Sequence, residues 1–519
     1  MQESNEGLAG TKPLVVAVVG PTNEGKTSLL RTLTNDPDFG HVNAFTGTTV
    51  RAEVQKVFYR GVVEILQLID TPGFQTSSEI LELVLDASSS RGGAYELSDI
   101  LAAIPLDDED FRHDLRAWRE IERCDVVIFV ANVAEDPKKS LLKNTLELLR
   151  HIGKPTLVAY NNLGNGPGDE GAQLSATGTP ENYQSAWDET LRRNSFFLVQ
   201  RYDAHRRSFL DEVDLFEKLV ALAREPQTQR ALRLEIAERQ ARERRRLGDS
   251  RRLLADALVD VVAFRLIETN VEPDNWQSRQ RELEASLRER VLQREHRAQS
   301  AILETWGFKL GSLARETLVV EDESLETDDL FDHDVKKSGA VGVGVGAAIG
   351  AIADIASAGL SFGTGLTIGA FLGGLLGGGG VMAYNSKYDR KRKRLSTRVQ
   401  PRVVAAFLAR GVDLIHKLEQ RGKAVDDAMQ TTVSAQPKSI EVPNVTRMLE
   451  ACSRFPGYSR LNVDKSTLGA FDLDWRAPLA WLSGEERKPR EEVVTALAEE
   501  LRRVLPDDEE RRGGTHGGM

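Results

Sequence analysis

The sequence predicts an α/β domain with a mainly parallel sheet, followed by a mostly α-helical C-terminal region. After residue 226 the composition shifts to Arg, Glu, Leu and Ala with helical periodicity. Before it, short apolar runs alternate with helical patterns, as in a parallel sheet. A turn at Arg60 and Gly61 predicts a hairpin that adds one antiparallel edge strand. The apolar runs are residues 14–19, 62–69, 125–130, 155–160 and 196–200.

The chain of 519 residues is long enough for several domains. We predict an antiparallel helical pair in the second segment, because Pro273 interrupts its helical pattern. Residues 75–124 and 164–180 exceed ordinary connections and are predicted insertions. The predicted segments are the α/β domain (1–225), the helical pair with an acidic linker (226–335), a Gly-rich helical hairpin with a basic flank (336–395), a helical region (396–506) and a frayed tail (507–519).

The net charge is −11, which argues against a general nucleic-acid coating protein, so we expect no nucleic-acid partner. Two cysteines in this length are typical of a reducing compartment. The first residues are acidic and polar with no apolar stretch after them, so no signal peptide is expected.

A phosphate-binding loop directly follows the first strand. Residues 20–27 read Gly-Pro-Thr-Asn-Glu-Gly-Lys-Thr, the pattern G-x-x-x-x-G-K-[ST] between a strand and a helix. Backbone N–H groups of such a loop wrap a polyphosphate, and the lysine reaches the β and γ oxygens. Lys26 is the expected phosphate ligand, and Thr27 is the expected Mg²⁺ ligand. The predicted nucleotide contacts in this loop are Gly20, Asn23, Glu24, Gly25, Lys26, Thr27 and Ser28.

A second motif, Asp-Thr-Pro-Gly at residues 70–73, closes the apolar run that ends at Ile69. Ligands of open α/β sheets bind at the carboxyl ends of strands, so Asp70 is expected to hold Mg²⁺ and the Gly73 amide to sense a γ-phosphate. Between the motifs, residues 36–50 are rich in turn formers, as a switch loop would be. Thr49 is the predicted second Mg²⁺ hydroxyl ligand, with Thr48 as its competitor.

On these residues, the first 225 positions resemble the Era/TrmE-like bacterial GTPases. The resemblance implies GTP as substrate, and GTP or GDP as the bound nucleotide. It also implies a hydrophobic residue after the Asp-x-x-Gly motif, here Phe74, in place of a water-orienting glutamine. Slow intrinsic turnover is expected. Relatives with asparagine at the fourth loop position use K⁺, which makes Asn23 a candidate potassium ligand, and a turn-capping role is the alternative. Lys26, Asn23 and Thr49 are the expected catalytic residues.

The base-reading loop departs from that family. A guanine-reading Asn-Lys-x-Asp is expected after the strand at 155–160, but the chain has Asn161, Asn162, Leu163 and Gly164. Asn161 and Asn162 are the predicted base contacts, and Asp169 is a candidate substitute for the missing aspartate. Because the aspartate normally rejects adenine, the base preference is left open between guanine and adenine.

Residues 339–384 predict a glycine-zipper hairpin. Gly342, Gly346 and Gly350 are spaced by four residues, and so are Gly365, Gly369, Gly373 and Gly377, which is typical of close helix packing in membranes. Basic residues at 336–337 and 390–394 favour two spans with both ends cytoplasmic. A soluble buried hairpin is the alternative, and Asp354 favours it.

The whole arrangement resembles a bacterial family of GTPases whose C-terminal domain has no assigned function. Our first hypothesis is a Mg²⁺-dependent GTPase switch, coupled to the Gly-rich hairpin on the cytoplasmic face of the bacterial inner membrane. The second is a soluble cytoplasmic regulatory GTPase that binds a protein or ribosomal partner through its helical domain. The third is an ATPase, or a nucleotide-binding scaffold without hydrolysis.

Overall fold

The chain divides into two compact units. The computed structural model describes residues 8, 10–34, 36, 39, 52–89, 111–161, 183–203, 207–308, 365–366, 384–399, 401–421, 433–434, 443–461 and 488–507. Unit 1 is Met1–Arg242 with Glu419–Asp426, and unit 2 is Glu243–Leu418 with Asp427–Met519. This division differs from the five predicted segments, because unit 1 extends beyond residue 225 into the helical region.

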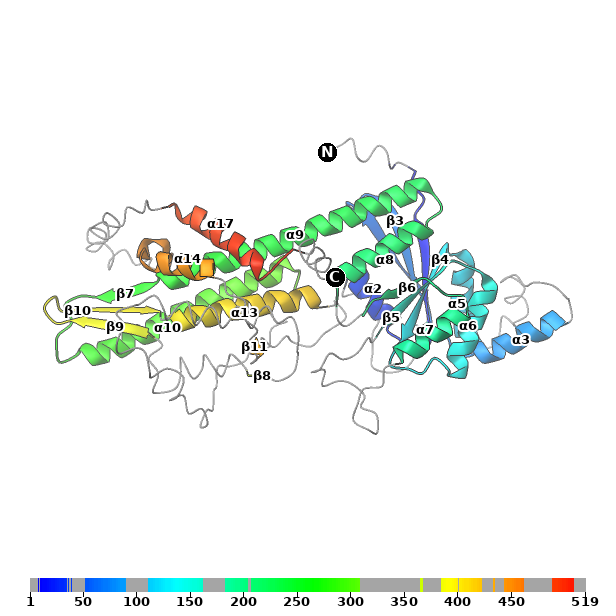
Figure 1. Cartoon of the computed structure of the whole chain (residues 1–519), viewed down its shortest axis with the longest axis horizontal. Helices are drawn as coiled ribbons and strands as arrows, with labels where there is room; N and C mark the ends of the chain where they lie inside the picture. The colour runs from blue at the N-terminus through cyan, green and yellow to red at the C-terminus, as the bar shows by residue number, and fades with distance from the viewer. Residues whose placement is uncertain are drawn as a thin grey trace. The chain divides into compact units, whose positions relative to one another are not determined.

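Unit 1 is built on a six-stranded sheet with the order β2-β3-β1-β4-β5-β6 (Figure 1). Only β2 is antiparallel to its neighbour, so the predicted parallel sheet with one antiparallel edge strand is confirmed. The strands are β1 (Leu14–Val19), β2 (Glu53–Tyr59), β3 (Val63–Asp70), β4 (Val126–Asn132), β5 (Thr156–Asn161) and β6 (Val199–Arg201).

Helices cover both faces of this sheet, which explains why its central strands are apolar without a break. In β1, Val16 and Val18 enter one core cluster with α2, α8 and the start of α9. Ala17 and Val19 enter the other cluster with α3, α5, α6 and α7. The helices are α2 (Lys26–Thr34), α3 (Ser77–Ser89), α5 (Arg112–Arg123), α6 (Ser140–Ile152), α7 (Gln184–Arg193), α8 (Phe209–Leu222) and α9 (Pro226–Ala263).

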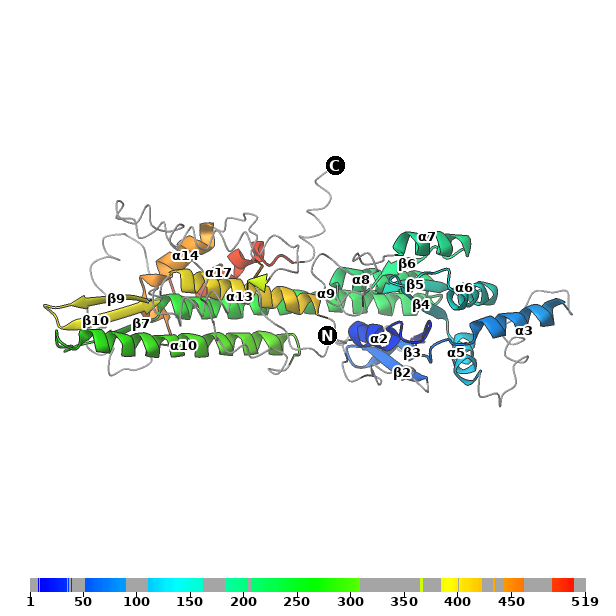
Figure 2. The ribbon, with the colours of Figure 1, turned by 90° about the horizontal axis from the view of Figure 1, so that it is seen from below.

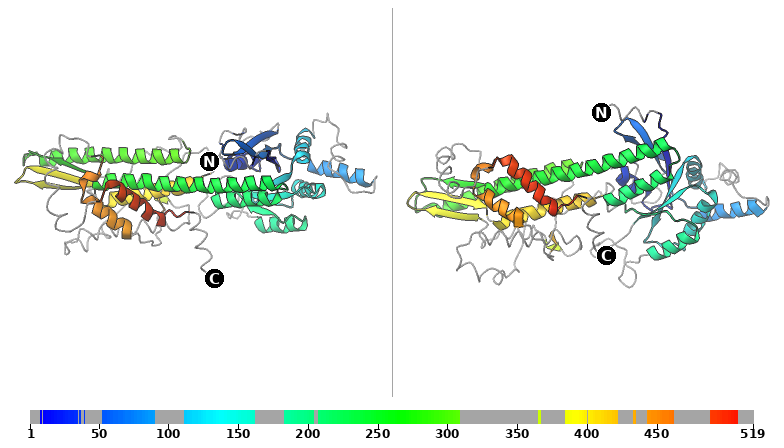
Figure 3. Two further views of the ribbon diagram at one scale, coloured as in Figure 1. Left: turned by 90° about the horizontal axis from the view of Figure 1, so that it is seen from above. Right: turned by 45° about the horizontal axis from the view of Figure 1, so that its top comes forward.

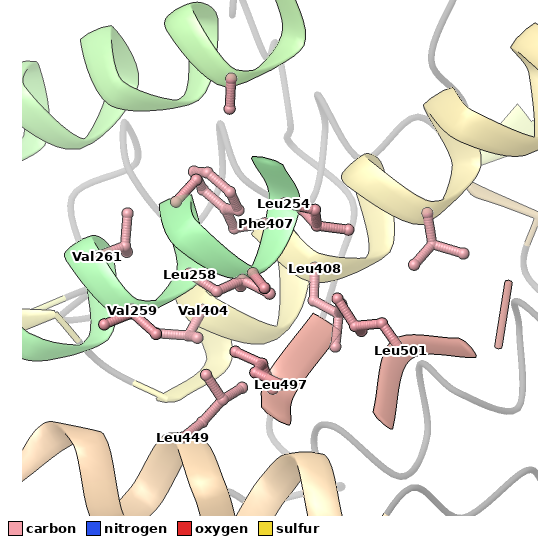
Figure 4. Close-up of a cluster of buried hydrophobic side chains, with 14 of the residues drawn as sticks. Leu254, Leu258, Val259, Val261, Val404, Phe407, Leu408, Leu449, Leu497 and Leu501 are labelled. Atoms are coloured by element: carbon pink, nitrogen blue, oxygen red, sulfur yellow. The ribbon is translucent and has the colours of Figure 1, made fainter. Parts of the chain in front are cut away.

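Unit 2 is mostly helical around one hydrophobic cluster, shown in Figure 4. Leu254 and Leu258 of α9 pack there with Val404 and Phe407 of α13 and Leu497 of α17. A three-stranded antiparallel sheet with the order β7-β10-β9 completes the unit. The further elements are β7 (Arg265–Glu268), α10 (Trp276–Thr305), β9 (Tyr384–Asp389), β10 (Arg394–Val399), α13 (Pro401–Gln420), α14 (Pro443–Ser453) and α17 (Arg490–Glu500).

The second half of α9 and α10 form the predicted antiparallel pair, and Figure 2 shows them side by side. Trp306 Nε1, just after α10, donates to Ser250 Oγ of α9 (3.0 Å), and Arg294 Nε of α10 donates to Asp260 Oδ2 of α9 (2.8 Å). Residues later in α10 therefore contact residues earlier in α9, which means that the two helices run antiparallel. Figure 3 shows α9 as one uninterrupted helix, whose residues up to Arg242 belong to unit 1 and whose remainder belongs to unit 2.

Three expectations for the C-terminal region differ from the structure. Residues 265–268 form β7 and do not continue the helix, because pairing with β10 satisfies their backbone groups. Residues 390–393 are the turn between β9 and β10, so they do not directly flank a hydrophobic helix. Gly365 and Leu366 form β8, paired with β11 (Val433–Ser434), where a helix was expected.

The other zipper glycines, at positions 342, 346, 350, 369, 373 and 377, lie outside the described residues, as does Asp354. The zipper therefore stays a prediction. None of the described helices combines the length and the apolar character that are needed to cross a lipid bilayer.

Candidate nucleotide-binding site

The loop between β1 and α2 has the conformation that its glycines predict. Gly25 has φ +86°, and a Cβ atom there would collide with the side-chain amide of Asn161. Any other residue would therefore be strained and would displace Asn161. Asn23 also has positive φ, 69°, and its side chain is exposed. Asparagine tolerates this conformation better than most residues, which gives its presence a structural reason beside the proposed potassium contact.

Lys26 points back over the loop. Its Nζ donates to the carbonyl oxygens of Pro21 (2.7 Å) and Gly20 (3.1 Å). Burial lowers the pKa of Lys26 to about 8, and the charges of Asp70 and Glu24 oppose this effect. The ammonium group is thus desolvated and fixed by backbone atoms, so a phosphate oxygen would meet a cation that has little water to lose.

Thr27 and Asp70 converge as the two motifs predict. Thr27 Oγ1 donates to Asp70 Oδ2 (2.5 Å), which joins the start of α2 to the end of β3. Asp70 Oδ1 is buried and accepts no hydrogen bond from the described residues. Burial raises the pKa of Asp70 to about 6. A buried carboxylate oxygen without a donor, beside a threonine hydroxyl, fits a hard cation such as Mg²⁺.

The segment after Asp70 lies directly against the loop. Phe74 N donates to the Gly20 carbonyl oxygen (3.1 Å). A Cβ atom at Gly73 would lie 2.5 Å from the Cα of Thr22, so only glycine fits there. Gly73 is therefore close to the loop that would hold the phosphates.

Phe74 belongs to the hydrophobic core and not to the site. Its side chain is fully buried and stacks on Trp118 of α5, with 4.8 Å between ring centroids. This packing explains the hydrophobic residue at the position after Gly73.

Gln75, which the sequence analysis did not single out, is exposed, and its Nε2 donates to Thr22 Oγ1 (3.4 Å). Its backbone is fixed by the buried carboxylate of Asp114, which accepts from Gln75 N (2.9 Å) and Thr76 N (3.2 Å). No local sequence signal links Asp114 to this segment.

Asn161 supports the loop from the end of β5. Its Nδ2 donates to the Glu24 carbonyl oxygen (2.8 Å), and the side chain is fully buried. Glu24 is also buried, and burial together with the charge of Glu135 raises the pKa of its carboxyl to about 8. Ser28 is buried in the first turn of α2. The predicted residues Thr48, Thr49, Asn162 and Asp169 lie outside the described part of the chain.

A second support that the sequence did not reveal comes from α9. Arg239 Nη1 donates to the carbonyl oxygen of Leu33 (2.9 Å), at the C-terminal end of α2. Its guanidinium group also pairs with Glu212 and Glu235 and lies over the ring of Phe216. The helix that begins at the phosphate-binding loop is therefore held at its other end by α9.

This sheet order and this loop define an α/β domain with the P-loop GTPase fold. A family model described as 50S ribosome-binding GTPase matches residues 15–162. A second model, described as domain of unknown function DUF3482, matches residues 189–475, which is more than half of the chain. The chain belongs to the DUF3482 family.

Known proteins resemble the N-terminal part. The tRNA modification GTPase MnmE of Lysinibacillus sphaericus is 30% identical over 163 residues, 31% of this chain and 34% of that protein. MnmE of Thermotoga maritima is 31% identical over 160 residues, 30% of this chain and 34% of that protein. The chain thus spans about a third of the length of these curated relatives.

Two solved structures are also similar. Aquifex aeolicus Era, bound to GDP and aluminium fluoride, is 18% identical with a TM-score of 0.28, and the match covers 41% of this chain and 58% of that chain. The G domain of the T. maritima FeoB iron transporter is 20% identical with a TM-score of 0.24, and the match covers 41% of this chain and all of that chain.

Proposed function

We propose that this protein is a Mg²⁺-dependent switch that binds and hydrolyses GTP. The observation that carries the proposal is the meeting of Lys26, Thr27 and Asp70 at the carboxyl ends of β1 and β3. One lysine cation, one hydroxyl and one buried carboxylate oxygen are the groups that a nucleoside triphosphate with its metal ion requires.

Each residue has a separate task in this proposal. Lys26 binds the β and γ oxygens, and the amides of residues 20–27 enclose the phosphates. Thr27, Asp70 and Thr49 would hold Mg²⁺, which supplies charge neutralisation on the phosphates when bound. Gly73 lies beside the loop, where its amide can report the presence of the γ-phosphate.

Slow turnover is part of the proposal. Phe74 is committed to the core against Trp118, so its position offers no group that orients water. We propose that K⁺, held by Asn23, supplies positive charge that an arginine supplies in other GTPases.

The base preference depends on the loop after β5, in which the lysine and the aspartate of the Asn-Lys-x-Asp motif are missing. Asn161 already donates one amide hydrogen bond to the loop, so its capacity to read a base is reduced. We expect GTP to be preferred over ATP by a smaller margin than in relatives with Asn-Lys-x-Asp. An ATP preference in titrations would replace the GTPase proposal with the ATPase alternative.

The test is a nucleotide-binding titration of the wild type and Lys26→Ala, with single-turnover hydrolysis of bound GTP. Lys26→Ala should lose most triphosphate affinity and hydrolysis without unfolding, because Lys26 contacts backbone carbonyls and not the core. Lys143→Ala, an exposed lysine on α6, is the matched control and should behave as the wild type. Unchanged GTP affinity in folded Lys26→Ala would refute the proposed site.

The location of the protein in the cell and its binding partner are proposed from the sequence, separately from the nucleotide-binding site. We keep the cytoplasmic face of the inner membrane as the proposed location, supported by the sequence of residues 336–395. A ribosomal or protein partner is the alternative, and the similarity to the model described as 50S ribosome-binding GTPase favours including ribosomes in a search for partners. Fractionation of cells into ribosomes, membranes and soluble protein distinguishes these locations.

A further inference from the structure

The turn between β9 and β10 concentrates positive charge at one end of unit 2 (Figure 1). Arg390, Lys391, Arg392 and Lys393 form the turn, and all four are exposed. Neither Arg390 nor Lys391 has a carboxylate partner among the described residues. The whole chain has a net charge of −11, whereas this turn is positively charged.

The turn is held rigidly from both sides. Asp389 Oδ1 accepts hydrogen bonds from Lys391 N (3.0 Å) and Arg392 N (3.2 Å), which closes the turn through a side chain. Lys393 Nζ contacts both carboxylate oxygens of Glu272 (2.7 and 2.8 Å). Val271 N donates to the Lys393 carbonyl oxygen (2.8 Å). The backbone of the turn therefore has little conformational entropy left to lose when it meets a partner.

More positive charge lies behind the turn on one face of the sheet. Arg394 and Arg398 of β10 are half-buried, and Arg398 is directly opposite Arg265 of β7. Burial, then the charges of Arg398 and Arg394, lower the pKa of Arg265 to about 10. Arg265 Nη2 also donates to the carbonyl oxygen of Ser453 (3.4 Å). Like charges opposite each other on neighbouring strands oppose folding, so this face keeps its positive charge at some cost in stability.

The opposite face of the sheet is covered. Leu395, Thr397 and Val399 are buried, and Tyr388 stacks on Trp276 of α10 with the rings 3° from parallel. Figure 2 shows α10 along this side of the hairpin. Among the described residues, the turn is therefore the exposed part of this hairpin that concentrates positive charge.

We propose that the β9–β10 turn, residues 390–393, binds the anionic headgroups of a lipid bilayer. The exposed cations of this fixed turn match a flat surface of phosphate groups, and each one that reaches the surface contributes about a fivefold gain in partitioning. This inference deepens the proposed location and is independent of the GTPase chemistry. It requires no transmembrane helix.

Two observations favour lipid over nucleic acid. The turn itself carries no aromatic side chain to stack on a base, and the nearby ring of Trp276 is already stacked on Tyr388. The carboxylates of Asp389 and Glu272 lie beside the turn, where they would repel the backbone of a polynucleotide that runs past it. A flat bilayer needs to touch only the protruding side chains.

The test is sedimentation of the full chain with vesicles of phosphatidylcholine, with and without phosphatidylglycerol. Wild type should bind only the anionic vesicles and be released by salt. The double variant Arg390→Gln with Lys391→Gln should partition about 25-fold less, which is two fivefold steps. The double variant Arg230→Gln with Arg233→Gln, at exposed positions of α9, removes the same charge and should bind as the wild type.

The other outcomes overturn the inference in distinguishable ways. Equal binding by the turn variant and the wild type would leave the membrane location standing and refute the role of the turn. No binding of wild type to anionic vesicles would refute both. Tighter binding of the turn to a single-stranded RNA oligonucleotide than to vesicles, lost in the same variant, would replace the lipid with nucleic acid. GTP titration in parallel reports the GTPase proposal separately.

Discussion

Replacing Phe74 with glutamine would introduce the water-orienting residue of other GTPases at the position after Gly73, and we expect it to damage the fold without speeding hydrolysis. Phe74 is fully buried against Trp118. Loss of its apolar burial costs about 1.5–3 kcal/mol. Loss of the ring stack costs about 0.5–1.5 kcal/mol. Burial of an amide without partners costs about 1–3 kcal/mol. The total, about 3–7.5 kcal/mol, is a large part of the usual stability of a domain.

The measurement is calorimetric unfolding of the nucleotide-free protein, combined with single-turnover GTP hydrolysis. Two units are present, so the transition that GTP shifts upward is the one to follow, since it reports unit 1. Phe197 has 76% of its surface exposed, so Phe197→Gln is the matched control and should change stability by less than about 0.5 kcal/mol. Phe74→Leu should cost about 1 kcal/mol, because it stays apolar. If Phe74→Gln is as stable as Phe197→Gln and hydrolyses GTP faster than the wild type, Phe74 does not have the core role assigned here.

Two further predictions concern the supports of the site, and a third concerns its proposed potassium ion. Burial raises the pKa of Asp114 to about 6 from an ordinary 3.8, so its contribution to stability is largest below pH 4 and is lost as the pH rises through 6. Between about pH 4 and pH 6, the unfolding free energy of the wild type should fall by about 3 kcal/mol relative to that of Asp114→Asn. Denaturation curves in which the difference between the two proteins does not change with pH would contradict this. Arg239→Met should destabilise unit 1 by about 3–5 kcal/mol, because Glu235 loses its buried partner and Glu212 keeps only Arg207. Exposed Arg233→Met should not destabilise it, and calorimetry compares the two variants. GTP hydrolysis should be faster in K⁺ than in Na⁺, and Asn23→Ala should remove the difference; equal rates for the wild type in both salts would end the potassium role.

The parts of the site that the sequence predicted are those encoded by neighbours along the chain. A strand, a glycine loop and a helix in succession fix the positions of Lys26 and Thr27, and a strand end fixes Asp70. The supports Asp114 and Arg239 come from distant elements, so no local pattern marks them.

The same reason explains the missed strand β7. Four residues after a long helical pattern become a strand only because β10, far along the chain, pairs with them. Tertiary pairing overrides a weak local preference. The sequence likewise predicts that the basic run 390–394 flanks a hydrophobic hairpin. It does not show the turn, because the turn depends on contacts with the distant residues Glu272 and Val271.

The position of the family match has a consequence for protein engineering. The DUF3482 match begins at residue 189, within α7, and so contains β6, which is the last strand of the GTPase sheet, together with α8. Ala231, Leu232 and Ile236 of α9 then fill the core of unit 1. A chimera that joins this helical region to another GTPase at the sequence boundary would replace one edge of the host sheet and part of its core. The region is therefore exchangeable only together with the edge of the nucleotide domain, and a truncation that ends before Pro226 would leave an open hydrophobic core.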